Sequence, residues 1–446
     1  MGSSGKKSSS GQEAIYDARK LGAPRMMVLG IQHMFAMFGA TVLVPQLTGL
    51  SVSSTLLFAG LGTLLFHFIS KGMVPAFLGS SFAFLAGYGA IAPNGEKELL
   101  PYACFGVAAA SLLYFVLAAL IKAFGVKKVM KFFPPVVTGP IIIAIGLTLS
   151  QSAVDNCSAN WLVALTAIII VVVCNIWGKG MIRVIPIILG ALGSYIVAVI
   201  MGEVDFTMIR EAAWFGLPVH MENTVFEIFK APDTSLLITA VITIMPIAIA
   251  TMMEHIGDIA AISSTVNRNF FEEPGLHRTL VGDGLATLVA SLFGAPANTT
   301  YGENTGVLTL SRVYDPRVIR IAACIAIVFS FSPKFAAVIS SMPAATCGGI
   351  SIVLYGMISA VGVRNVVENQ VDFKESRNVI IAALILVLSI GVKYSAAGAI
   401  NIHVGEVNIG LSGLAVGALV GIILNAVLPD FSSEDMVEGK EPKPLK

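Results

Sequence analysis

The sequence predicts an all-α polytopic membrane protein with fourteen transmembrane segments in two inverted repeats of seven. Three observations predict this class: the composition, the count of apolar segments, and a similarity between the two halves of the chain. Of 446 residues, 56% are hydrophobic and only 12% are charged, whereas soluble proteins carry about 25% charged residues. Runs such as 162–177 and 184–201 approach the ~20 apolar residues that span a hydrocarbon core.

Fourteen apolar segments follow one another along the chain. Their approximate spans are 26–46, 52–71, 74–91, 101–124, 134–151, 159–177, 182–201, 235–261, 276–294, 299–314, 317–333, 342–361, 376–394 and 408–428. The third and tenth segments contain clusters of Pro, Gly, Ser and Asn, at 75–82 and 295–306. Because such clusters interrupt helices, we expect neither segment to be an unbroken helix.

The distribution of Lys and Arg predicts the orientation. With the N-terminus in the cytoplasm, 23 of the 28 basic residues fall on the cytoplasmic side and five fall outside, as the positive-inside rule requires. Residues 1–10 lack the apolar stretch of a signal peptide. We therefore expect a multi-pass protein of the cytoplasmic membrane with both termini in the cytoplasm.

The two halves of the chain share short sequence patterns. Phe133–Ile141 resembles Ser341–Ile350 at an offset of about 208 residues, and Gln32-His33 parallels Glu254-His255 at an offset of 222. Seven spans separate the halves, and an odd number gives them opposite topology. Paired interrupted segments in an inverted repeat indicate a transporter binding site. This predicts five parts: a tail at 1–24, a repeat at 25–201, an outer connection at 202–234, a second repeat at 235–429 and a tail at 430–446.

Two polar clusters interrupt the apolar pattern, at Asn298–Gly306 and at Glu254–Asp258. An ionisable group at bilayer depth costs about 2.5–3.5 kcal/mol on insertion scales, so these clusters predict a midplane binding site and therefore a carrier. Glu254 and Glu303 can accept hydrogen bonds from the N–H groups of a planar, amide-rich solute. Phe82 can stack on the ring of such a solute.

Four stretches stand out as motifs: Gln32–Pro45, Leu78–Phe84, Pro274–Arg278, and Glu303-Asn304-Thr305-Gly306 followed by Ser311-Arg312. Together they resemble the nucleobase–ascorbate transporter family, also called nucleobase–cation symporters, with the bacterial uracil permeases as the most similar branch. The similarity extends over about 25–429, and the last of the four motifs corresponds to the family signature.

The resemblance implies a fold and an activity. The implied fold has a core domain, a gate domain, and short antiparallel strands in the third and tenth segments, and the protein is usually a homodimer. The implied activity is import of uracil by proton symport with alternating access of the core against the gate. It implies a transporter and not an enzyme, with no cofactor, no metal and no nucleic-acid partner, only membrane lipid around it.

The resemblance also implies roles for individual residues. The residues implied to bind the substrate are Glu254, Glu303, Phe82, Gly302, Tyr301 and Ala40. Those implied to support the site are His33, Asn304 and Asp283. Proton coupling is assigned to Glu254, Asp258 and Glu303. Glu254 and Asp258 are four residues apart on one helix face, and neighbouring carboxylates can share a proton. We expect His255 to face away from this site.

Some alternatives stay open. Asp258 and Asp283 stand where the uracil pattern has His and Asn, and both are typical of the purine (xanthine) branch, which usually has Gln at the position of Glu303. We favour uracil because Glu303 is the proposed direct ligand. Sodium remains an alternative to the proton. An anion exchanger is disfavoured because acidic groups repel anions, and an intramembrane aspartyl protease because the Gly-x-Gly-Asp pattern is missing before Asp283.

Overall fold

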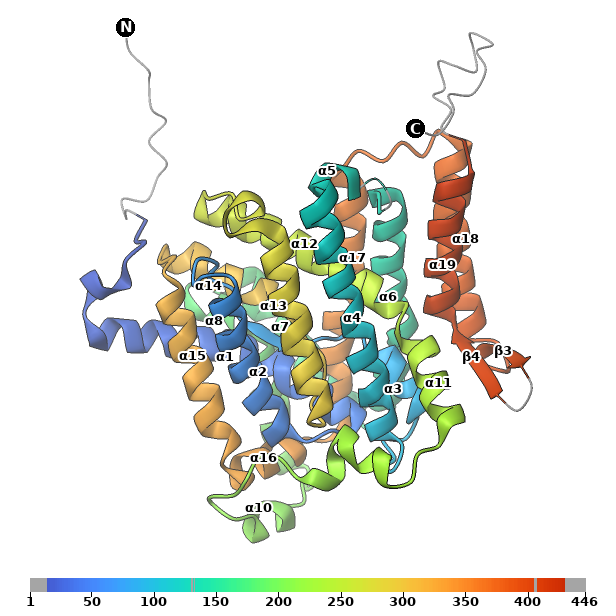
Figure 1. Cartoon of the computed structure of the whole chain (residues 1–446). Coiled ribbons are helices and arrows are strands. Elements are labelled where there is room, and N and C mark those ends of the chain that lie inside the picture. Colours follow the sequence, from blue (N-terminus) through green and yellow to red (C-terminus); the bar gives the residue numbers. More distant parts are fainter. Residues whose placement is uncertain (1–13, 130, 132, 405–406, 430–446) are drawn as a thin grey trace, which may run out of the picture.

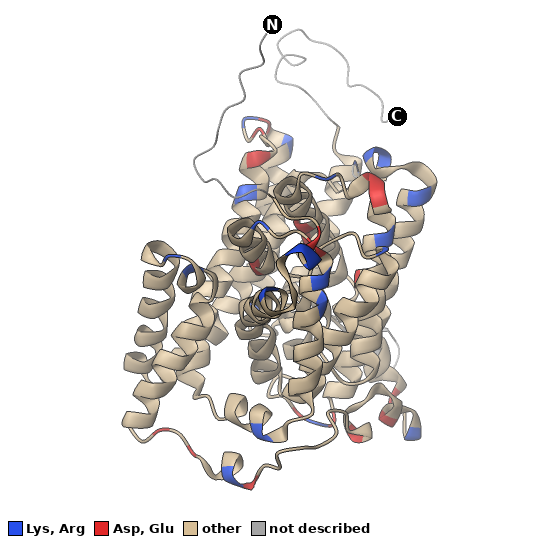
Figure 2. Cartoon of the chain, turned by 90° about the vertical axis from the view of Figure 1, so that its left-hand side faces the viewer, with Lys and Arg blue, Asp and Glu red and all other residues tan. Residues whose placement is uncertain are grey.

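The computed structural model describes residues 14–129, 131, 133–404 and 407–429, and these form a bundle of helices (Figure 1). Residues 1–13 of the predicted N-terminal tail and the whole predicted C-terminal tail, 430–446, lie outside the described residues. Figure 2 shows that charged residues are sparse over the helices and lie mainly in loops and at helix ends. The protein is therefore a mostly helical, polytopic membrane protein.

Seven described helical spans are long and apolar enough to cross a membrane. They are α1 (Ala23–Thr48), α2 (Val52–Ile69), α4 (Leu100–Phe124), α6 (Pro135–Ser158), α11 with α12 (Thr234–Ile244 and Ile247–Val266), α17 (Ala344–Glu368) and α18 (Ser376–Lys393). An eighth span is possible where α15 (Pro316–Ser330) and α16 (Pro333–Ser340) meet at 90°. The predicted number of fourteen spans stays a prediction.

The remaining elements are shorter. The shorter helices are α3 (Leu85–Ile91), α5 (Val126–Val129), α7 (Trp161–Trp177), α8 (Met181–Val184), α9 (Pro186–Ile200), α10 (Thr207–Glu211), α13 (Leu276–Leu292), α14 (Gly302–Ser311) and α19 (Gly413–Val427). Short 3₁₀ helices lie at Ala18–Leu21, Met221–Asn223 and Val225–Lys230, and a π-helical turn lies at Phe271–Gly275.

Polar side chains fix where several helices begin. The Asn160 side chain accepts hydrogen bonds from the backbone N–H groups of Leu162 and Val163 at the start of α7. Asp315 accepts from the N–H of Arg317, one residue after Pro316 opens α15. Such caps satisfy N–H groups that the helix itself leaves unpaired, and proline is well suited to the first helical position because it has no N–H.

The third and tenth predicted segments are broken, as the sequence predicts. Each consists of a three-residue strand followed by a short helix: β1 (Leu78–Ser80) precedes α3, and β2 (Asn298–Thr300) precedes α14. The two strands pair antiparallel, with Gly79 opposite Thr299. The strands implied by the family resemblance are therefore present, and two segments far apart in the sequence meet at their breaks.

A second strand pair was not predicted. β3 (Ala399–Val404) and β4 (Val407–Ser412) form an antiparallel hairpin at the lower end of α18 and α19 in Figure 1. The description all-α and the span 408–428 are thus wrong here, because the last helix begins only at Gly413. Apolar and polar residues alternate through Ile400-Asn401-Ile402, and a period of two favours a strand although the average hydropathy is high.

Helices α6 and α17 pack closely through glycine. A Cβ atom added at Gly146 would lie 2.2 Å from the backbone oxygen of Tyr355 and 2.3 Å from the hydroxyl of Ser359. On the facing helix, a Cβ at Gly362 would lie 2.6 Å from the backbone nitrogen of Ile143. Small residues at such contacts let helix backbones approach in a membrane, where packing drives association.

We expect the substitution Gly146→Val to destabilise the protein by about 1–3 kcal/mol, because an overpacked interface must move apart. The melting temperature in detergent, followed by loss of the monodisperse size-exclusion peak, measures this. Gly391→Ala is the matched control, since a Cβ at Gly391 has no neighbour within 4 Å among the described residues. Equal melting temperatures for the two variants would contradict the predicted tight contact.

The first described residues, 14–22, form what we call the N-terminal strap. Ile15 forms a parallel bridge with Val313 between α14 and α15, and the Tyr16 hydroxyl donates to the backbone oxygen of Val266 at the end of α12 (2.8 Å). A hydrogen bond from Arg19 lowers the pKa of the half-buried Asp17 carboxyl to about 2. The strap therefore joins the ends of α12 and α14 to the start of α1.

Candidate functional site

The paired strands β1 and β2, which we call the β1–β2 crossing, form hydrogen bonds with the segments around them. Beyond the paired residues, the Ser81 N–H donates to the Ala297 oxygen (2.8 Å) and the Tyr301 N–H to the Phe77 oxygen (2.9 Å). The Leu78 N–H donates to the hydroxyl of Thr63 on α2 (2.9 Å). Backbone that leaves the helical pattern in a membrane needs such partners, because lipid supplies none.

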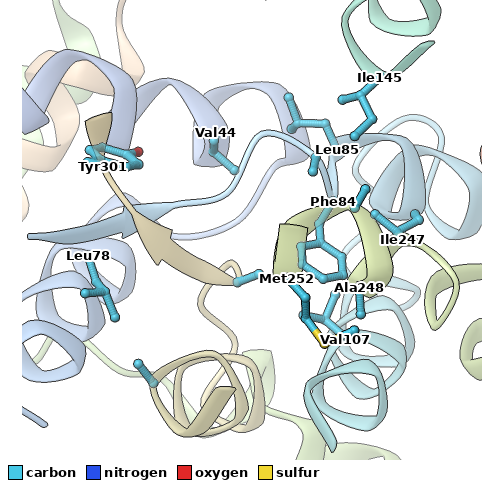
Figure 3. Packing of buried hydrophobic residues seen from close by; sticks show 14 of the residues in the cluster. Val44, Leu78, Phe84, Leu85, Val107, Ile145, Ile247, Ala248, Met252 and Tyr301 are labelled. Atoms are coloured by element: carbon cyan, nitrogen blue, oxygen red, sulfur yellow. The ribbon is translucent and has the colours of Figure 1, made fainter. Parts of the chain in front are cut away.

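Asparagine and threonine side chains attach the second strand to two neighbouring helices. The Asn298 amide donates to the Phe58 oxygen on α2 (2.9 Å), and the Thr287 hydroxyl on α13 donates to the Asn298 oxygen (2.7 Å). Buried apolar side chains pack around the crossing, including Phe84 beside Met252 (Figure 3). The crossing is thus a rigid platform for the residues that follow each strand.

Gly79 lies at the most crowded point of this platform. The ring of Tyr301 covers it, and the Tyr301 hydroxyl donates to the Ser80 oxygen (2.8 Å). A Cβ at Gly79 would be 2.5 Å from the Tyr301 ring and 2.6 Å from the Thr41 hydroxyl. The predicted site residue Ala40 is fully buried next to Thr41, whose backbone oxygen accepts from the Ser80 hydroxyl (3.0 Å).

Three predicted carboxylates lie together at this crossing. Glu254 and Asp258 come from α12, and Glu303 comes from the first turn of α14. All three are half-buried, and the charge of Glu303 acts on both Glu254 and Asp258. The Thr300 hydroxyl donates to Asp258 Oδ2 (3.2 Å). The structure thus brings together, from α12 and α14, the three carboxylates that the sequence predicts.

Open space and an aromatic side chain lie near the carboxylates. Gly302 is exposed, and a Cβ there would have Asp258 Oδ1 as its nearest neighbour at 3.7 Å, so it leaves open space beside Asp258. Phe82 is half-buried, with its ring edge-on to Tyr355 of α17 at 6.4 Å between centroids. An aromatic ring and carboxylates beside open space suit a small planar solute with N–H groups.

The predicted supporting residues lie further back. The Asn304 amide donates to the His33 backbone oxygen (3.0 Å) and lies 3.2 Å from His33 Nδ1, so these two residues join α14 to α1. Asp283 on α13 is fully buried, 3.4 Å from Nδ1 of His255. The structure gives the positions and contacts of these residues, and their functional roles stay predictions.

Three neighbours of the site were missed in the sequence. His255, expected to face away, is fully buried behind β2, with Nδ1 3.3 Å from the Thr300 hydroxyl. Thr300 contacts Asp258, and Tyr355 contacts Phe82. In the sequence, His255 follows Glu254 and Thr300 precedes Tyr301, and this adjacency to predicted residues could have indicated both. Tyr355 lies on α17, and only the packing of that helix brings it close to Phe82.

Two cavities lie between different sets of helices. One, of about 390 Å³, is lined by α3, α11 and the β3–β4 hairpin, whose Gly410 oxygen accepts from the Thr243 hydroxyl (2.7 Å). The other, of about 950 Å³, is lined by α1, α8, α14 and the N-terminal strap, and it reaches Gln32 and Val307. Val307 lies one helical turn beyond Glu303.

Comparison with known proteins identifies the family. A sequence model described as "Permease family" matches residues 24–398. The uracil permease of Bacillus subtilis (strain 168) is 40% identical over 417 residues, which cover 91% of this chain and 92% of the relative. The uracil permease of Escherichia coli (strain K12) is 36% identical over 410 residues, 90% of each chain. This chain belongs to the nucleobase–ascorbate transporter family. The protein is a membrane permease and not an enzyme.

Solved structures share the fold of this permease. The transmembrane domain of a cyanobacterium bicarbonate transporter, BicA, has a TM-score of 0.60 at 15% identity, covering 92% of this chain and 98% of its own. A murine anion transporter of the Solute Carrier 26 family, member A9, in the inward-facing state, has a TM-score of 0.63 at 11% identity, covering 95% and 73%. At these identities the likeness concerns the fold alone.

Proposed function

We propose that this permease imports uracil by proton symport. The observation that carries the proposal is the proximity of Glu254 and Glu303 at the β1–β2 crossing, with Phe82 two residues after β1. Uracil offers N–H donors on one ring edge, and ionised carboxylates are acceptors only. The relatives at 36–40% identity that are named uracil permeases support the same substrate.

In the proposed cycle Asp258, Glu254 and Glu303 take part in coupling. A proton bound from outside relieves the repulsion among adjacent carboxylates in a poorly hydrated site. Uracil then binds against the carboxylates, with its ring on Phe82 and its edge near Gly302 and Tyr301. Loss of the proton to the cytoplasm restores the repulsion, which favours release. Sodium in place of the proton remains the alternative driving ion.

The architecture of this proposal is the fourteen-span inverted repeat with a core and a gate domain. Seven long spans, the α15–α16 pair, the helices α7, α9, α13 and α19, and the strand–helix segments β1–α3 and β2–α14 together supply fourteen candidates. We propose cytoplasmic termini from the positive-inside count, and a homodimer from family membership.

Uptake of radiolabelled uracil into proteoliposomes with an alkaline interior tests the function. We expect accumulation that a protonophore abolishes, that added sodium does not change, and that excess unlabelled xanthine does not inhibit. Strong inhibition by xanthine would instead support a purine–cation symporter, the second candidate, which Asp258 and Asp283 favour. Uptake that requires sodium and ignores the protonophore would overturn the proton as coupling ion.

Alternating access predicts that the 950 Å³ cavity closes during transport. Leu21 of the N-terminal strap and Met181 of α8 line this cavity together. In a cysteine-free background, we expect the pair Leu21→Cys and Met181→Cys to form a disulfide in the closed state and to stop uracil uptake until a reductant is added. The uptake rate before and after oxidation measures this.

The matched control joins residues that lie on one side of the cavity. Ile15 and Val313 are bridge partners, so Ile15→Cys with Val313→Cys should cross-link in every state and leave the uptake rate within about twofold. Full uptake with Leu21 and Met181 cross-linked would contradict closure of this cavity.

A further inference from the structure

Four side chains form a continuous row behind the carboxylates. His255 Nδ1 lies 3.4 Å from Asp283 Oδ2 on one side and 3.3 Å from the Thr300 hydroxyl oxygen on the other. The same hydroxyl lies 3.2 Å from Asp258 Oδ2. His255, Asp283 and Thr300 are essentially without solvent exposure, whereas Asp258 is half-buried and reaches the open space of the site. The row therefore leads from a sealed carboxyl group to an accessible one.

The Thr300 hydroxyl has a single proton and two acceptors to choose from. It can donate to Asp258 Oδ2, or to His255 Nδ1 when that nitrogen carries no hydrogen. When Nδ1 is protonated it can no longer accept, so the hydroxyl proton is left for Asp258. The tautomer of His255 thus decides whether Asp258 has a hydrogen-bond donor from this direction.

Asp283 fixes that tautomer. Within the described part of the chain, neither carboxyl oxygen of Asp283 has a hydrogen-bond partner and Nε2 of His255 has none either, and Nδ1 of His255 lies 3.4 Å from Asp283 Oδ2. The buried carboxyl gains a donor only if His255 carries its hydrogen on Nδ1. A histidine tautomer is commonly set by the group that faces one ring nitrogen, and the ring is held edge-on by Phe66 at 6.2 Å between centroids.

We infer that His255 is a positioning residue for Asp258. Asp283 keeps the hydrogen of His255 on Nδ1, and this directs the Thr300 hydroxyl to Asp258. The inference rests on the proposed function, in which Asp258 takes part in coupling. The other titratable groups facing the row are Glu254 on the same helix, Glu303 on α14, and Tyr114 on α4, whose hydroxyl donates to Thr251 (2.7 Å).

The test compares two activities of the same proteoliposomes. Accumulation of uracil driven by a pH gradient requires coupling, whereas counterflow of labelled against unlabelled uracil without a gradient requires only binding and movement. In His255→Phe the ring is kept and both nitrogens are lost, and in Thr300→Val the hydroxyl is lost at nearly constant shape. A hydrogen bond to a charged group is worth a factor of about ten or more, so accumulation should fall about tenfold relative to counterflow.

Conservative variants supply the matched controls. His255→Asn places an amide nitrogen close to the position of Nδ1, and Thr300→Ser keeps the hydroxyl. We expect both to restore the ratio of accumulation to counterflow to within about twofold of the unchanged protein. If Asn and Phe at position 255 lower both activities equally, the residue only fills space and the inference is overturned; an unchanged ratio in His255→Phe overturns it as well.

Nitrogen-15 NMR of histidine-labelled protein gives a second measurement on the intact chain, with the His255 signal assigned by its loss in His255→Asn. We expect hydrogen on Nδ1 in the unchanged protein and a shift toward Nε2 in Asp283→Asn. Hydrogen on Nε2 in the unchanged protein would overturn the inference even if a transport variant failed to fold. Failure of the unchanged protein to transport uracil would overturn the proposed function first, and the coupling role with it, before any variant is compared.

Discussion

Replacing either glutamate of the site by glutamine, Glu254→Gln or Glu303→Gln, should reduce uracil uptake roughly 10- to 150-fold at low substrate concentration. The size follows from about 1.5–3 kcal/mol for a hydrogen bond to a charged group, at 1.4 kcal/mol for each factor of ten. Glutamine keeps the shape of the side chain, so the loss isolates the carboxylate. Initial uptake rates in proteoliposomes, at equal amounts of reconstituted protein, measure the effect.

The chemical reason lies in what each side chain presents. A carboxylate offers two acceptor oxygens, whereas an amide offers one oxygen and one NH₂ group. An NH₂ group directed at an N–H of uracil leaves both donors without a partner in a partly buried site. Sites built to hydrogen-bond a substrate discriminate strongly for this reason. Glu303→Asp and Glu254→Asp, which keep the charge and shorten the reach, should lose less than the glutamine variants.

The Glu303→Gln variant also distinguishes the two substrate hypotheses, uracil and xanthine. Glu303→Gln brings position 303 to the residue usual in the purine branch, beside Asp258 and Asp283 that already match that branch. Uracil uptake at the unchanged rate in Glu303→Gln would show that Glu303 is not a ligand. Xanthine uptake gained by this variant as uracil uptake is lost would assign the substrate choice to position 303.

The substitution Gly79→Ala should have the second large effect, on both folding and uptake. A Cβ atom would lie 2.5 Å from the Tyr301 ring and 2.6 Å from the Thr41 hydroxyl. Tyr301 cannot swing away without losing its hydrogen bond to the Ser80 oxygen (2.8 Å). We expect a loss of about 1–3 kcal/mol of stability from overpacking, and uptake near background because α14 begins directly after Tyr301.

Thermal unfolding in detergent and uracil uptake together measure the Gly79→Ala effect. Gly356→Ala is the control, because a Cβ at Gly356 in α17 has no neighbour within 4 Å among the described residues. That variant should keep the unchanged melting temperature and uptake. A Gly79→Ala protein that is as stable and as active as the control would mean that the strands do not position the site.

The sequence was a good guide wherever a single segment carries the information. The apolar runs predict the helices, and the Pro/Gly/Ser/Asn clusters at 75–82 and 295–306 predict the breaks that become β1–α3 and β2–α14. The hairpin β3–β4 was missed because average hydropathy does not separate an apolar strand from a helix, although the alternation at Ile400–Ile402 was there to be seen.

For the site, chain chemistry alone selected Glu254, Asp258 and Glu303. Placing a charged residue inside an apolar segment costs free energy, so such a residue indicates a functional role before any contact is known. His255 is the opposite case: a helical position suggested that it faces away, and only the arrival of Asp283 from α13 and Thr300 from β2 gives its Nδ1 two neighbours.

By itself, then, the sequence determined that this is a membrane permease with two broken segments, and it predicted an acidic site at the bilayer midplane, because hydropathy, charge and motifs are properties of local composition. Only the tertiary structure decided that Gly79 lies under the Tyr301 ring, that Phe82 meets Tyr355, and that a sealed row runs behind Asp258. The first two contacts join residues more than two hundred positions apart, and the row joins residues of three separate elements, α12, α13 and β2. They depend on the packing of whole helices, which no local pattern specifies.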